Sequence, residues 1–193
     1  MALRYAELTP LWELMHCTVR AGQFLQRATQ EQKPSGLLRE AEDLRRQTTA
    51  WVRECSVKIQ NTFITAIDAK VMLYLIYYLY KLSRNLLCTT QFLLSEQPLE
   101  SPDLTRYLRW VSGYTQKVIQ RSEQSFRAVS RGKTQRLCTV FDTSEGETLS
   151  MQACRDLSTQ ENIRLAAILA MLRQCENTVY DIDVFTLQQS IYE

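Results

Sequence analysis

Three carboxylates in the last third of the sequence, Asp142, Glu145 and Glu147, have the residue type and spacing that best suit a metal ion. Carboxylates a few residues apart can share a helical face, and their hard oxygen atoms are ligands for divalent cations. A solvated helix face produces the same spacing, and this simpler interpretation stays open. A divalent or iron site at these residues is therefore a secondary hypothesis, and no cofactor is expected.

Catalytic and zinc-binding motifs are absent from the 193-residue sequence. It has neither a glycine-rich phosphate loop of the GxxxxGK(S/T) or GxGxxG type nor a GxSxG or HExxH segment. Its single histidine, His16, has no thiol or hydroxyl residue at a suggestive spacing, and its 6 cysteines form no CxxC pair. We therefore expect a protein that is not an enzyme and that holds no structural zinc ion.

The charge balance argues against nucleic acid as a partner. The chain carries 23 basic and 21 acidic residues, which gives a net charge of +2, whereas a nucleic-acid-binding protein concentrates positive charge to neutralise phosphates. Basic residues do alternate with Trp110 and Tyr114 between residues 106 and 121. This combination can stack on bases, but an amphipathic bundle helix also produces it by default.

The most apolar run of the sequence is Val71–Tyr80. Ten residues of helix rise about 15 Å, which is half the thickness of the hydrocarbon layer of a bilayer. The first ten residues lack the apolar core of a secretion signal, and scattered cysteines without such a signal indicate a reducing compartment. The sequence therefore predicts a cytoplasmic protein with a buried helix over this run. Peripheral contact with a membrane or a membrane protein is the alternative.

The elements that must position these residues are helices. Only 5 glycines and 4 prolines interrupt the chain, which favours a few long helices over a many-stranded sheet. Apolar residues recur at three- and four-residue spacing, and Thr9-Pro10 and Ser101-Pro102 each supply an N-cap followed by a proline. A break near Ser144–Gly146 in the fifth helix stays open, because glycine costs about 1 kcal/mol in a helix interior. The first expected helix runs from Thr9 to the break at Lys33–Gly36, and the second runs from that break to about Ile59. The other four cover about residues 67–96, 101–130, 133–157 and 158 to near the C-terminus.

These helices fall into two successive sets of three within one helical domain, residues 1–193. The first half covers about residues 9–96 and the second about residues 101–193. The sequence thus predicts an all-α, six-helix bundle of two three-helix halves. An internal duplication stays open, because the identity between the halves is too low to establish a repeat.

The segment Asn61–Asp68 joins the second and third expected helices and reads N-T-F-I-T-A-I-D. It resembles the junction of the PhoU-like family of phosphate transport regulators, the accessory proteins of Pit-type phosphate permeases, in which a T-F-I-T-P-hydrophobic-D segment joins two helices. The residues that match are Thr62, Phe63, Ile64, Thr65 and Asp68. Ala66 stands where the family usually has proline, and Gln174–Asn177 is similar to the family's R-C-E-D segment in the last helix.

The resemblance implies a PhoU-like bundle, and it implies acids in an E-x-x-x-D pattern that hold metal clusters on helix faces. At matching positions this chain has bases or neutral residues: Arg45, Thr49, Lys70, Tyr80, Lys81, Arg84 and Arg173. Because lysine and arginine repel a cation, the metal site of the first half should be lost. Lys70, Lys81 and Arg84 either pair with acids of the bundle, which we favour, or bind an anion. Thr143, followed by Glu145 and Glu147, keeps part of the acidic pattern.

These features predict a non-enzymatic regulatory or accessory bundle that docks on a protein partner. The resemblance implies that the partner is an inner-membrane phosphate permease, so the protein would act at the cytoplasmic side of that membrane. Homo-oligomerisation through exposed apolar stripes is a further expectation. Tyr74, Tyr77 and Tyr78 would supply such a stripe if they were exposed, but we expect them to be buried. The alternatives are an adaptor or chaperone bundle unrelated to phosphate, and a bundle that binds metal through the acids of the fifth helix.

Overall fold

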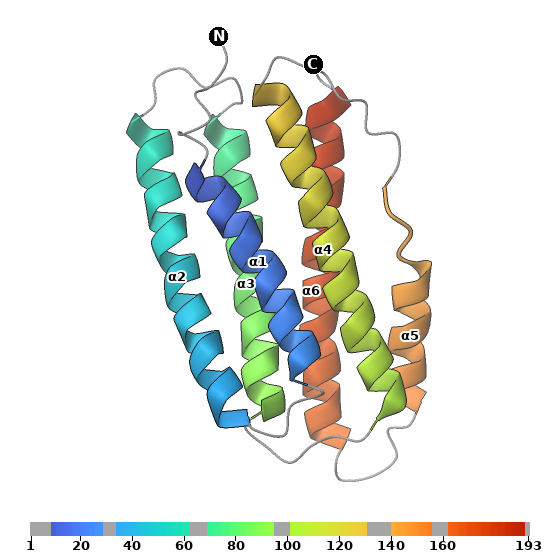
Figure 1. The fold of residues 1–193 in the computed structure, drawn as a ribbon. Helices are drawn as coiled ribbons and strands as arrows, with labels where there is room; N and C mark the ends of the chain where they lie inside the picture. The colour runs from blue at the N-terminus through green and yellow to red at the C-terminus, as the bar shows by residue number, and fades with distance from the viewer. Residues whose placement is uncertain are drawn as a thin grey trace.

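Buried side chains recur every three or four residues in each described part of the chain, which is the spacing of one helix face. The computed structural model describes residues 9–28, 34–61, 69–94, 101–130, 140–155 and 162–191. Those ranges contain no strand and six helices: α1 (Thr9–Arg27), α2 (Pro34–Asn61), α3 (Ala69–Leu94), α4 (Pro102–Ser130), α5 (Ser144–Arg155) and α6 (Asn162–Ile191). The prediction of an all-α bundle of six helices is confirmed (Figure 1).

The fifth helix begins later than predicted. We expected a start near residue 133, but residues 140–143 are not helical and α5 begins at Ser144. Oδ1 of Asp142 accepts the backbone N–H of Ser144 at 2.9 Å, and the backbone N–H of Phe141 donates to Oδ2 of Asp183 on α6 at 2.9 Å. These two carboxylates accept the backbone N–H groups of Phe141 and Ser144. The chain therefore has an alternative to helical hydrogen bonds at this point.

The helices pack as two sets of three that meet along two seams (Figure 1). α1, α2 and α3 contact one another, and so do α4, α5 and α6. α1 also packs against α4, and α3 packs against α6. The first and last helices of the two sets therefore form the centre of the bundle, and α2 and α5 lie at its two sides (Figure 1).

Each set contains a buried hydroxyl pair between its first and last helices. Thr18 of α1 lies 2.8 Å from Ser83 of α3, and Ser122 of α4 lies 2.8 Å from Thr186 of α6. Both threonines also donate to the carbonyl oxygen four residues earlier, so the serine is the donor within each pair. Threonine and serine therefore interrupt the apolar seams without leaving these hydroxyl groups unsatisfied.

One side of α3 is exposed along the apolar run that we expected to be buried. Tyr74 is 47% exposed and Tyr77 is 57% exposed, while Tyr78 is partly buried. The expectation of burial is therefore wrong for Tyr74 and Tyr77. α3 packs against α1, α2 and α6, and these neighbours do not enclose its whole surface. No helix within the described ranges combines the length and apolarity needed to cross a membrane.

A carboxyl group is buried where α4 and α6 meet. Glu176 is 8% exposed, and its Oε2 atom accepts the hydroxyl group of the fully buried Tyr107 at 2.5 Å. Burial raises the pKa of Glu176 above its ordinary range. The hydrogen bond from Tyr107 favours the charged form and opposes this rise, but burial dominates.

Replacing Glu176 with glutamine is expected to change how the free energy of unfolding depends on pH. Because the pKa of Glu176 is higher in the folded than in the unfolded chain, the folded chain retains the proton above about pH 4.3, where unfolded glutamate loses it. This stabilising contribution is complete below that pH and is lost as the pH rises through the folded-state pKa. Urea titrations from about pH 4 to pH 8 should show wild-type stability falling relative to Glu176→Gln. Parallel stability curves for the two proteins would show that this reasoning is wrong.

Candidate functional site

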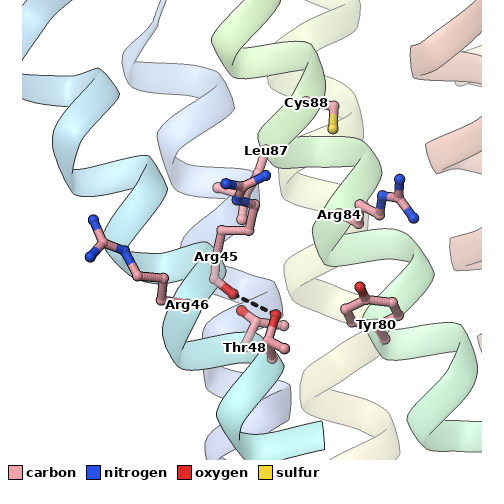
Figure 2. A pocket seen from close by; sticks show the side chains of 8 residues that line it. Arg45, Arg46, Thr48, Tyr80, Arg84, Leu87 and Cys88 are labelled. Atoms are coloured by element: carbon pink, nitrogen blue, oxygen red, sulfur yellow. Dashed lines mark hydrogen bonds between the residues drawn. The ribbon is translucent and has the colours of Figure 1, made fainter.

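A groove with a volume of about 510 Å³ lies between α2 and α3 (Figure 2). We call it the α2–α3 groove. It is lined by Arg45, Arg46, Thr48 and Thr49 of α2 and by Tyr80, Arg84, Leu87 and Cys88 of α3. Several of these residues stand where the PhoU-like pattern has acids, so the structure brings together substitutions that the sequence showed only one by one.

The order of buried residues in the two helices explains why these side chains line the groove. Leu44 of α2 and Leu79 of α3 are fully buried in the core. Arg45 and Tyr80 each follow one of these leucines by one residue, which rotates the side chain by about 100° around the helix axis. They therefore lie at the margin of the buried face. α2 and α3 are adjacent and antiparallel (Figure 1). Their margins therefore border the same groove.

The positive charges of the groove are only partly neutralised. Arg46 lies 3.3 Å from Asp43, one turn earlier on α2. Among the residues that the structure describes, neither Arg45 nor Arg84 has a carboxylate at ion-pairing distance. The favoured expectation that Arg84 pairs with an acid of the bundle is therefore not met in the described part of the chain.

The arginines are spread over the groove (Figure 2). Arg45 extends toward Leu87 of α3, whereas Arg46 points away from α3 and Arg84 extends from α3 in the direction away from α2. The three guanidinium groups therefore do not converge on one point. Such an arrangement suits several anionic groups held on a larger body better than one small ion.

Guanidinium groups give this groove its chemistry. Each presents a planar fork of N–H donors that fits a carboxylate or a phosphate group in a bidentate manner. The hydroxyl groups of Thr48 and Thr49 already donate to the carbonyl oxygens of Leu44 and Arg45, at 2.8 and 3.0 Å, so their protons are in use. The arginines are therefore the donors that the groove offers to an anionic partner.

The three acidic metal candidates lie elsewhere, at the start of α5. Asp142 caps the helix, and the backbone N–H of Ser144 lowers the pKa of its carboxyl group. Glu145 borders a second hollow, of about 490 Å³, beside Trp110, and Glu147 is exposed in the first turn. No group of three His, Cys, Asp or Glu side chains within the described ranges is arranged to hold a metal ion.

The histidine, the aromatic and basic residues of α4 and the junction segment were also singled out in the sequence. His16 is exposed on α1, with Nε2 3.7 Å from a carboxylate oxygen of Glu123. Tyr114 is buried and Arg121 pairs with Asp183, so neither provides an exposed platform for bases. The junction residues Thr62, Phe63, Ile64, Thr65 and Asp68 lie outside the described residues.

Sequence reasoning missed four residues of the groove, namely Arg46, Thr48, Leu87 and Cys88. A usable signal existed for Arg46, since it adjoins Arg45 and both precede Thr49 by about one helical turn. Leu87 and Cys88 carried no such signal, because their side chains become part of a site only when α2 lies beside α3.

No protein-family model matches the chain, and a search of curated proteins finds no match either. The comparisons therefore assign no family. The likeness of Asn61–Asp68 to the PhoU-like junction remains a resemblance of sequence.

Proposed function

We propose that this protein is a non-enzymatic regulatory or accessory bundle that binds an acidic segment of a partner protein in the α2–α3 groove. One observation carries the proposal: Arg45 and Arg84 border the same groove without an acidic partner among the described residues. A guanidinium group that forms an ion pair within the fold has a carboxylate beside it, and its planar fork of donors is then occupied. Arginines that lack one and line a hollow are suited to an external anion.

The energetics of charged hydrogen bonds support a protein partner. A hydrogen bond to a charged group contributes about 1.5–3 kcal/mol when it forms away from water. Partner carboxylates that engage Arg45 and Arg84 would therefore contribute much of the affinity of a moderate complex. Opposite charge on the partner would also accelerate association, and salt would weaken it.

A Pit-type phosphate permease at the cytoplasmic side of the inner membrane is the partner that we propose. The support for this choice is the resemblance of Asn61–Asp68 and Gln174–Asn177 to the accessory proteins of such permeases. An adaptor or chaperone bundle unrelated to phosphate would use the same groove for a different partner. A metal-binding role for α5 is less well supported, because Asp142 serves as a helix cap.

Co-purification and phosphate uptake test this proposal. The full chain is expressed together with the Pit-type permease of its own organism, either intact or with Arg45→Glu and Arg84→Glu combined. The intact chain should co-purify with the permease and change the rate of phosphate uptake. Losing two charged contacts of about 1.5 kcal/mol each should weaken the complex roughly a hundredfold in the double variant.

Arg109→Glu is the matched control, because Arg109 is an exposed arginine on α4, outside the α2–α3 groove. It should leave both co-purification and uptake unchanged. Equal binding by the intact chain and the double variant would rule out the groove as the docking site. If no permease binding or uptake effect occurred, while another acidic protein bound in an Arg45- and Arg84-dependent manner, the adaptor hypothesis would replace the phosphate hypothesis.

A further inference from the structure

The exposed side chains near the α2–α3 groove change character toward the connection between the two helices. Leu73 and Tyr77 of α3 are 43% and 57% exposed. We call these two residues, which lie on α3 next to the residues that line the groove, the apolar end of the groove. Large apolar side chains that gather at the surface mark contact sites when polar residues border them, and here arginines do.

Helical spacing places the apolar end on the same face of α3 as Arg84. Tyr77 precedes Arg84 by seven residues, or two turns, and Leu73 precedes it by eleven residues, or three turns. At 1.5 Å per residue, Leu73 and Tyr77 lie about 10–16 Å from Arg84 along the helix axis.

We infer that the α2–α3 groove accepts an amphipathic helix of the partner protein. Its carboxylates would lie at Arg45 and Arg84, and its bulky apolar side chains, two to three turns away on the same face, would lie at the apolar end. The inference rests on the proposed function, and it adds the secondary structure and the residue pattern of the docking segment.

A helical occupant fits the surroundings better than an extended one. The backbone groups of α2 and α3 are used within those helices, so the groove offers no strand edge with which an extended segment could pair. A helix satisfies its own backbone hydrogen bonds and presents one face of side chains to a groove between two other helices.

Two other occupants match the described residues less well. A single small anion cannot engage guanidinium groups that do not converge, and it leaves the apolar end uncovered. A second copy of this chain would need free acids to meet the arginines. However, of the three acids of α2 just before the groove, Glu40 and Asp43 already pair with Arg27 and Arg46, which leaves Glu42 alone for two arginines.

Peptide display tests the residue pattern of the docking segment directly, whichever protein supplies that segment. A library of helix-forming peptides about 15 residues long, near the length at which isolated helices become marginally stable in water, is selected on the full chain. Peptides that also bind the Arg45→Glu/Arg84→Glu variant are removed. The selected peptides should carry acids two to three turns from bulky apolar residues. Their affinity should fall roughly tenfold or more with Leu73→Ser/Tyr77→Ser, and Arg109→Glu should leave it unchanged.

The outcomes separate the inference from the proposed function. Selected peptides with acids but no fixed apolar position, and with unchanged binding to Leu73→Ser/Tyr77→Ser, would overturn the helix pattern and leave the basic docking site intact. Failure to select any acidic peptide would overturn both. If millimolar phosphate displaced every peptide regardless of its sequence, the groove would be a small-anion site. If sedimentation showed a dimer that the Arg45→Glu/Arg84→Glu variant loses, the occupant would be a second copy.

Discussion

Replacing Asp183 with alanine is expected to lower the free energy of unfolding by about 3–5 kcal/mol, the cost of removing one member of a buried ion pair. Asp183 is 0% exposed, and its carboxylate pairs with Arg121 and accepts the backbone N–H of Phe141. The side chain of Arg121 is only 12% exposed, and its guanidinium group also stacks on the ring of Phe141 at 3.8 Å. The variant would therefore leave a buried positive charge with little access to water.

The control for Asp183→Ala removes both charges. Combining Asp183→Leu with Arg121→Met replaces the pair with apolar groups, which is often neutral or stabilising for buried ion pairs. The double variant should therefore recover most of the lost stability, apart from the hydrogen bond to Phe141. Chemical denaturation of the single and double variants measures both values. If Asp183→Ala cost less than about 1 kcal/mol, the pair would be far better hydrated than its burial indicates.

Replacing Gly146 with alanine is expected to lower the free energy of unfolding by up to about 2 kcal/mol. Gly146 is buried in α5, and a β-carbon at this position would overlap the six-membered ring of Trp110 on α4. The Trp110 ring packs against the rings of Tyr107 and Tyr114, which restricts its movement away from α5. Overpacking of this kind costs about 1–3 kcal/mol, whereas alanine gains about 1 kcal/mol over glycine in helix propensity. The clash should therefore outweigh the gain.

Gly113→Ala is the matched control for this substitution. Gly113 is also helical, but a β-carbon there would meet nothing within 4 Å. The Gly113→Ala variant should gain helix propensity without a clash, which should stabilise the protein by about 0.5–1 kcal/mol. Urea denaturation gives both values, and the near-ultraviolet circular dichroism of the tryptophans should change only for Gly146→Ala. Stabilisation by both alanines would mean that α5 does not pack closely on Trp110.

The number and order of the helices could be predicted because the spacing of apolar residues is a local property. Leu165, Ile168 and Leu172, for example, follow helical spacing and are buried in α6. The start of α5 could not be predicted in the same way. It depends partly on Asp183, a residue distant in sequence that accepts the backbone N–H of Phe141.

The candidate site could be predicted only in pieces. The sequence showed Arg45 and Arg84 as departures from an acidic pattern, but it could not show that both border one groove, because that depends on the packing of α2 against α3. The exposure of Tyr77 was missed for the same reason. An apolar run shows that side chains avoid water in general, but the neighbouring helices decide which of them remain at the surface.

The central claim is that Arg45 and Arg84 form a docking site for an acidic helix. Its most direct test is the affinity of a fluorescent helical peptide, with glutamates two turns from a leucine, for the full chain. Fluorescence anisotropy should show binding that salt weakens, a roughly hundredfold loss with Arg45→Glu/Arg84→Glu, and no change with Arg109→Glu. Equal affinity of the intact chain and the Arg45→Glu/Arg84→Glu variant would contradict the claim.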